Sequence, residues 1–199
     1  MMRNPVVFLV LAASCSSPLK DSTPVDATPA AVRQKAIHAL ARGRAEDARR
    51  FADRALQLAN GHDSESHLIL AILDFDACEP EKARDHMYAG NPAPAEFPFM
   101  DLLRNVQEGL HRFGRVRIVA GPDGSTMLAT RIEPTRPPLD PEGRRCVDAL
   151  RRRLRGDPLL LPADVMVPAG EYRLNDGPPI QVRPDDVTTV QAPDGRGAR

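Results

Sequence analysis

The chain of 199 residues is poor in aromatic side chains, cysteine and long apolar runs. It contains no Trp, and aromatic residues make up only 4% of the chain. Its three cysteines, Cys15, Cys78 and Cys146, are too few and too widely spaced for a disulfide-rich scaffold or a zinc site. No apolar run reaches the roughly 18 residues of a transmembrane helix. The 27 basic and 27 acidic side chains cancel, and this balance argues against a nucleic-acid binder.

The composition favours a folded protein that contains both helices and strands. Apolar residues make up 42% of the chain, enough for a core in one modest domain or two small ones. Twenty prolines and thirteen glycines are too many for a wholly helical protein. The helical pattern of residues 30–113, followed by the strand pattern of residues 114–192, then predicts an α+β class.

The first fourteen residues have the pattern of an export signal. Arg3 supplies a positive charge, residues 6–13 form a short apolar stretch, and the small residues 12–14 come directly before Cys15. The apolar stretch is too short to cross a bilayer core of about 30 Å. Residues 1–14 are therefore expected to be a signal peptide that is removed.

The sequence around Cys15 resembles the lipobox of bacterial lipoproteins. Ala12 stands where that motif prefers Leu, and Ser14 is an accepted small residue. The resemblance implies that Cys15 becomes the lipidated first residue, held in the membrane by acyl chains such as palmitate. Ser16 follows in place of the usual inner-membrane retention Asp, which implies an outer-membrane lipoprotein facing the periplasm or the surface. An ordinary secreted protein is the alternative.

Residues 15–29 are polar and contain proline, and they are expected to be the lipidated N-terminus and a flexible tether. From residue 30 to residue 113, apolar residues recur at intervals of three and four, which predicts helices. The expected helices lie within residues 30–43, 45–59, 64–75, 80–88 and 97–113.

The helical region resembles tetratricopeptide repeats. Ala48 and Ala55 lie seven residues apart, Gly43 occupies the turn between two helices, and residues 81–83 echo residues 46–48. The resemblance implies an antiparallel array of helical hairpins over residues 30–113, a type of fold that commonly binds peptides or proteins. A generic small helical bundle is the alternative.

Residues 114–192 have the pattern of short strands. Alternation in 116–120 and in 126–132, around the turn 121–124, predicts a hairpin. Further short strands are expected at 164–167, 171–174, 180–183 and 187–191, and this spacing is typical of a small antiparallel β-sandwich. Residues 193–199 are expected to be a disordered tail.

This second half resembles the PEGA domain, a short β-sandwich of bacterial envelope proteins. Residues 122–125 match its turn, and residues 167–174 match its later Gly-x-Tyr strand. An insertion at 133–162 departs from the family and contains an expected helix at 140–156.

The inserted helix combines a narrow apolar stripe with many arginines. Six arginines follow one another closely: Arg144, Arg145, Arg151, Arg152, Arg153 and Arg155. They are candidates for contact with anionic lipid, an envelope glycan or an acidic partner. The alternative is a solvated face on a helix that packs against the sandwich.

Cys78 and Cys146 remain once Cys15 is assigned to the anchor. An exported protein meets an oxidising compartment, where these two residues are able to form a disulfide. Two separate buried thiols are the alternative.

The usual signatures of catalysis are missing. No P-loop, dinucleotide fingerprint or Gly-x-Ser-x-Gly motif occurs. His62 and His67, near Asp63 and Glu65, lack a strong metal-ligand spacing, and helix-cap or solvated roles are expected for them. Asp74 and Asp76 form no recognisable catalytic pair and are expected at the exposed end of a helix. We expect no enzyme, no metal and no cofactor.

Together these features predict a non-catalytic, lipid-anchored adaptor of the bacterial cell envelope that binds a protein partner through its helices. The alternative is an envelope-binding module whose β domain or Arg-rich helix contacts peptidoglycan, glycan or anionic lipid.

Overall fold

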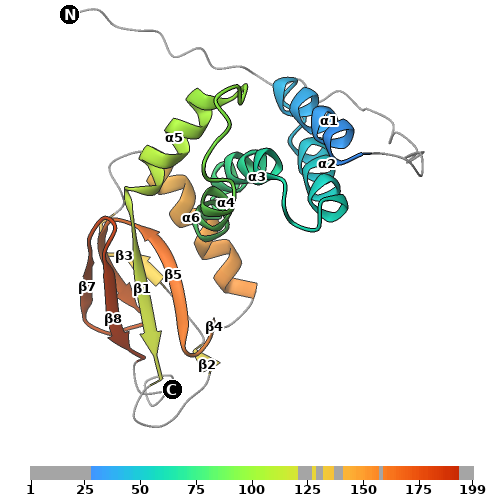
Figure 1. Cartoon of the computed structure of the whole chain (residues 1–199). Helices are drawn as coiled ribbons and strands as arrows, with labels where there is room; N and C mark the ends of the chain where they lie inside the picture. The colour runs from blue at the N-terminus through green and yellow to red at the C-terminus, as the bar shows by residue number, and fades with distance from the viewer. Residues whose placement is uncertain (1–27, 121–126, 129–131, 137–140, 157–158, 193–199) are drawn as a thin grey trace, which may run out of the picture.

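The computed structural model describes residues 28–120, 127–128, 132–136, 141–156 and 159–192 (Figure 1). Within these residues it contains six helices and three small sheets, which confirms the α+β class. Figure 1 shows helices α1 to α5 at one end of the molecule and the strands at the other. The expected signal peptide, Cys15, most of the tether, the turn at 121–124 and the tail at 193–199 lie outside the described residues.

The first four helices form two hairpins, α1 with α2 and α3 with α4. Their bounds are Pro29–Ala41, Ala45–Leu58, Ser64–Asp76 and Pro80–Ala89. The hydroxyl of Thr28 caps α1 by accepting a hydrogen bond from the amide of Ala31 at 3.3 Å. Gly43 has a φ of 68°, a backbone conformation that glycine adopts without strain, and it forms the turn between α1 and α2.

Small residues let α2 approach its neighbours closely. Ala48, Ala52 and Ala55 are fully buried on one face of α2. The central helix α3 is covered more completely, because every residue from Leu68 to Phe75 is buried. The core of the helical part therefore centres on α3.

The fifth helix, α5, spans Met100–Leu110 and is shorter than the segment 97–113 that the sequence predicts. Phe97 and Phe99 precede it with their rings in edge contact, at a centroid distance of 5.8 Å. Phe113 already belongs to the first strand. Gly109 lies against Phe75, so closely that a Cβ atom at position 109 would be 2.2 Å from the Cζ atom of Phe75.

The strands form two three-stranded sheets and one two-stranded pair. Their bounds are β1 Phe113–Val119, β2 Met127–Leu128, β3 Ile132–Pro134, β4 Leu159–Leu160, β5 Ala163–Pro168, β6 Gly170–Leu174, β7 Pro179–Val182 and β8 Val187–Gln191. The sheets have the orders β5-β1-β8, β2-β4 and β3-β6-β7. The four later strands that the sequence predicts are all present as β5 to β8.

The predicted hairpin of 116–120 with 126–132 is wrong. Strand β1 pairs with β5 on one side and with β8 on the other, so neither of its edges is open to the segment that follows it. Met127 and Leu128 pair instead with β4. The β1–β8 pairing is parallel, so this sheet is mixed, whereas the sequence pattern predicts antiparallel pairing throughout.

Helix α6, Pro141–Gly156, coincides with the predicted insert helix and lies where the helical and strand cores meet (Figure 1). Cys146 packs into the helical core, whereas Val147 and Leu150 pack into the core between the sheets.

Tyr172 is buried in the core between the sheets, and its hydroxyl donates a hydrogen bond to the carbonyl of Pro168 at 2.7 Å.

Further contacts join the helices to the strands. The amide of Met166 in β5 donates a hydrogen bond of 2.6 Å to a carboxylate oxygen of Glu81 in α4. The rings of Phe75 and Phe113 meet edge to face at a centroid distance of 6.2 Å. The helical and strand parts are therefore packed against each other.

Candidate binding surfaces

The predicted anchor residue Cys15 lies outside the described residues, so the structure does not bear on its lipidation. None of the helices in the described ranges combines the length and the apolar character that a membrane crossing needs.

The described arginines of α6 occupy different environments. Arg144, Arg145 and Arg152 are exposed, whereas Arg151 is half-buried and forms an ion pair of 3.4 Å with Asp148. The side chains of Arg153 and Arg155 lie outside the description. The exposed arginines lie on the same helix as the buried stripe of Cys146, Val147 and Leu150, so α6 is an amphipathic helix that serves both the core and the surface.

A disulfide joins Cys78 to Cys146, with 5.0 Å between their Cα atoms. Cys78 follows α3, and Cys146 lies in α6, so the bond connects the helical array to the inserted helix. The bond closes a sequence separation of 68 residues. Of the two alternatives that the sequence leaves open, the structure has the bonded one.

The structure corrects the predicted exposure of Asp74. Its side chain is completely buried between helices, and one of its oxygens, Oδ1, accepts a hydrogen bond of 2.6 Å from Arg49 of α2. The other oxygen, Oδ2, lies 3.6 Å from Nε2 of His86 in α4. The sequence prediction failed because Asp74 occupies the face of α3 that α2 and α4 cover, where a charged partner makes a buried carboxylate tolerable.

Asp76, two residues further on, is exposed as predicted. Surrounding protein atoms displace water from its carboxyl group and raise its pKa, and the positive charge of Arg145 partly offsets this effect. Asp76 and Asp74 therefore lie in different environments, one at the surface and one in the core.

The two candidate metal histidines do not come together. His62 is exposed, whereas His67 makes hydrogen-bond contacts with His86 and with the carbonyl of Gly61. The neighbouring carboxylates of Asp63 and Glu65 both form ion pairs with Arg33 of α1. Among the described residues no group of three or more His, Cys, Asp or Glu side chains is arranged to hold a metal ion.

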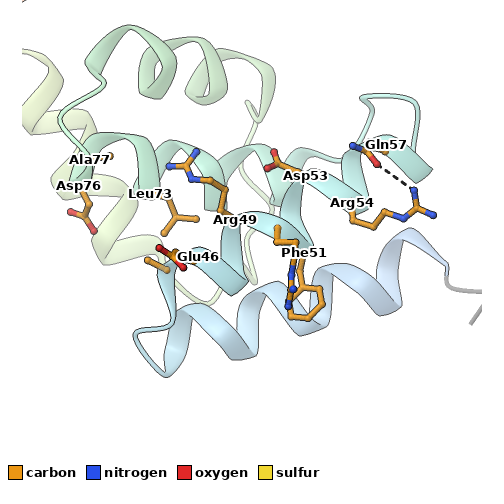
Figure 2. Close-up of a pocket in the computed structure, with 11 residues that line it drawn as sticks. Glu46, Arg49, Phe51, Asp53, Arg54, Gln57, Leu73, Asp76 and Ala77 are labelled. Carbon is orange, nitrogen blue, oxygen red and sulfur yellow. Dashed lines mark hydrogen bonds between the residues drawn. The ribbon is translucent and has the colours of Figure 1, made fainter. Parts of the chain in front are cut away.

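A charged groove of about 850 Å³ runs along the exposed face of α2 and reaches the end of α3 (Figure 2). Both basic and acidic side chains line it: Glu46, Arg49, Arg50, Asp53, Arg54 and Asp76. Figure 2 shows Phe51 directed toward α1, away from Arg49 and Asp53. The groove therefore places side chains of both charges on a surface that also includes apolar residues such as Leu73 and Ala77.

A second groove, of about 550 Å³, lies between α4 and α5 and has an apolar floor. Leu68 of α3, Met87 of α4, and Leu103 and Leu110 of α5 line it. Its border includes two exposed apolar side chains, with Tyr88 74% exposed and Met100 38% exposed. We call this region the α4/α5 groove.

Polar side chains stand at the rim of the α4/α5 groove. Arg84, Asn91 and Gln107 line it together with His111 and Asp185. The last two form a contact of 2.8 Å between His111 Nδ1 and Asp185 Oδ2, which joins the end of α5 to the turn before β8. The groove thus has an apolar floor and a polar rim, the combination that protein-binding and ligand-binding sites share.

The sequence patterns predict none of the residues of this groove as a site. Tyr88 lies at the end of the predicted helix 80–88, and Leu103 and Leu110 lie within the predicted helix 97–113. Apolar residues at helical spacing predict burial, but they do not show where two helices leave a groove between them.

No family model matches this chain, and searches of the curated proteins and of the solved structures find no match either. The resemblances to bacterial lipoproteins, tetratricopeptide repeats and PEGA domains therefore stay predictions.

Proposed function

We propose that this protein is a non-catalytic, lipid-anchored adaptor of the bacterial cell envelope. Cys15 anchors it in the outer membrane, and the helical region binds a protein partner. The observation that carries this proposal is the α4/α5 groove, which combines an apolar floor with the exposed side chains of Tyr88 and Met100 at its border.

The shape and chemistry of the groove favour a protein segment as its occupant. A volume of about 550 Å³ accommodates several side-chain groups of a peptide or helix. Tyr88 and Met100 offer apolar surface to water, and large aromatic and Met side chains are enriched at protein interfaces. The partner would bring apolar anchor side chains to the floor and polar groups to Arg84 and Gln107.

Photocrosslinking in the native envelope tests the groove directly. A photoreactive amino acid at Gln107, which lines the groove, should give a discrete crosslinked partner, and the double variant Tyr88→Ala, Met100→Ser should remove that product. The same amino acid at Glu108, exposed on α5 but outside the groove, is the matched control.

Equal crosslinking from positions 107 and 108 would contradict the proposal, because contact would then be unrelated to the groove. So would a product that the double variant leaves unchanged. Leu160→Ser is the control for loss of an exposed apolar side chain, since Leu160 is 69% exposed on β4, away from the groove.

The anchor has its own test. Wild-type cells labelled with a palmitate analogue should yield labelled protein in the membrane fraction, and Cys15→Ala should abolish both the label and the membrane association. Labelling that persists in Cys15→Ala would contradict lipidation at this residue, whatever the groove binds.

One observation favours the alternative function, contact with an anionic envelope component: Arg145 and Arg152 are both exposed on α6. The double variant Arg145→Glu, Arg152→Glu should then lose binding to phosphatidylglycerol vesicles. Arg54→Glu, Arg173→Glu makes the same change of charge at exposed positions elsewhere and should keep it. Equal binding by both variants would exclude α6 as the lipid contact.

A further inference from the structure

Four side chains and one carbonyl form a line of polar contacts across three helices. Arg49 of α2 donates to Asp74 of α3 at 2.6 Å, and the free oxygen of Asp74 lies 3.6 Å from Nε2 of His86 in α4. Nδ1 of His86 lies 2.8 Å from Nδ1 of His67, whose Nε2 lies 3.1 Å from the carbonyl oxygen of Gly61. We call the two rings the His67–His86 pair.

The contacts of the His67–His86 pair need one more hydrogen than two neutral rings can supply. The pair makes three contacts that each need an N–H group: one to the Gly61 carbonyl, one between the two Nδ1 atoms, and one to Asp74. Two neutral imidazoles carry only two N–H groups. The Gly61 carbonyl can only accept, so it fixes a hydrogen on Nε2 of His67, and one N–H group remains for the other two contacts.

The contact with Asp74 is the one that lacks its hydrogen in the structure. Oδ2 of Asp74 is buried and has no hydrogen-bond partner among the described residues. The separation of 3.6 Å from His86 is also longer than a hydrogen bond, whereas the Nδ1–Nδ1 distance of 2.8 Å is a short one. A buried carboxylate oxygen without a donor is costly, and a hydrogen on Nε2 of His86 would supply the missing donor.

Charged groups from two neighbouring helices act on the pair. From α2 these groups are Arg49 and Asp53, and from α3 they are Asp74 and His67 itself. Burial lowers the pKa of His86 and the charge of Asp74 raises it, with smaller effects from the other groups. His86 is therefore neutral near pH 7, and the charge of Asp74 opposes part of the effect of burial on its pKa.

We propose that the His67–His86 pair is a binding site for one proton. Uptake of this proton in acid changes the hydrogen-bond contacts that connect α2, α3 and α4. The added proton lies on Nε2 of His86, and all three contacts then have an N–H group. A second proton would place a hydrogen on both Nδ1 atoms at 2.8 Å, so the folded protein excludes it. Helix α4 also carries Met87 and Tyr88 of the α4/α5 groove. Proton uptake by the pair therefore changes the contacts of the helix that forms one wall of that groove.

Nitrogen-15 NMR of the full chain tests this proposal without any partner protein. Near neutral pH, Nδ1 of His86 should carry the hydrogen, and a scalar coupling across the Nδ1–Nδ1 hydrogen bond should be visible. Over the pH range in which the protein stays folded, the two rings together should take up one proton. The guanidinium signal of Arg49 should follow the same titration, because both groups share Asp74.

In the variant Asp74→Asn, the side-chain amide supplies the missing hydrogen. Its side-chain oxygen still accepts from Arg49, while its NH₂ group donates to Nε2 of neutral His86. Proton uptake by the pair should therefore move to lower pH or disappear in this variant. His38→Gln changes an exposed histidine of α1 and should leave the titration of the pair unchanged.

Two independent, complete titrations of His67 and His86 in the folded protein would overturn the proposal. So would a neutral His86 that carries its hydrogen on Nε2, or a titration of the pair that Asp74→Asn leaves in place. If Asp74→Asn does not fold, the coupling and the proton count in the wild type decide the question.

Discussion

Individual positions in this protein are constrained by contacts that their residue type alone does not reveal. Gly109 is the clearest case, because its missing side chain makes room for the ring of Phe75, which in turn contacts Phe113 of β1. Gly170 is different, since a Cβ atom there would meet its nearest neighbour, Tyr172, at an ordinary 3.6 Å. Two glycines with the same chemistry should therefore differ in their tolerance of alanine.

Gly109→Ala should lower the free energy of unfolding by about 1–3 kcal/mol, the usual cost of overpacking a core. The Cβ atom, 2.2 Å from Phe75 Cζ, forces the ring or the helix to move, and this outweighs the better helix propensity of alanine, about 1 kcal/mol. Urea unfolding measures the change. Gly170→Ala is the control and should stay within about 0.5 kcal/mol of the wild type. Equal effects at the two positions would show that the contact with Phe75 does not limit position 109.

The buried position of His86 predicts how stability depends on pH. Its pKa is lowered in the folded protein, chiefly by burial, from an ordinary value of 6.5. Below pH 6.5 the unfolded chain therefore binds a proton that the folded protein binds less readily, so the free energy of unfolding falls as the pH drops from 7.5 toward 5. His86→Gln should flatten this dependence, as measured by urea unfolding at several pH values. A variant with the wild-type slope would mean that other groups cause it.

At the scale of the elements, local patterns predict the helices and short strands well and their partners poorly. Apolar spacing together with Gly43 and Pro80 predicts the helices α1 to α4, because these signals act within a few residues. The neighbours of β1 are strands about fifty and seventy residues away, and no local signal selects them over the adjacent segment. The burial of Asp74 was missed for the same reason, since its partner Arg49 is on another helix.

Glu81 connects two elements, α4 and β5, that no local sequence pattern predicts to be neighbours. Its carboxylate accepts the amide hydrogen of Met166 on the outer side of β5, whose other side pairs with β1. Glu81→Ala leaves this partly buried amide without an acceptor and should destabilise the fold by about 1–3 kcal/mol in chemical unfolding. Glu81→Gln keeps an acceptor oxygen at the same place and should lose clearly less. If both variants lose the same amount, the charge of Glu81 matters more than the hydrogen bond.

At the scale of the whole molecule, the helical and strand parts are held together by contacts that come from distant parts of the chain. Helix α6 contributes to both cores, and its Cys146 is bonded to Cys78 at the end of α3. The α4/α5 groove has the same origin, because α3, α4, α5 and the turn before β8 all supply lining residues. A site built from so many elements exists only once the tertiary structure has formed, and this is why the sequence did not predict it.

The double variant Cys78→Ser, Cys146→Ser should therefore lose stability in the whole fold. For a loop of 68 residues, chain-entropy arguments give a loss of about 4 kcal/mol. Urea unfolding with and without reductant measures it, and mass spectrometry of the unreduced, alkylated protein confirms the bond in the wild type. Reductant should destabilise the wild type and leave the double variant unchanged. A wild type that does not respond to reductant would argue against the bond.

The parallel pairing of β1 with β8 also determines when the edge of β1 becomes paired during synthesis. Val187–Gln191 is the last strand of the described residues, and it lies beside Arg115–Val119, which is synthesised some seventy residues earlier. Until β8 has been synthesised, one edge of β1 is open and exposed to pairing with other chains. A chain cut before residue 187 leaves that edge open permanently. The edge of β1 is therefore covered only after residues 187–191 have been synthesised.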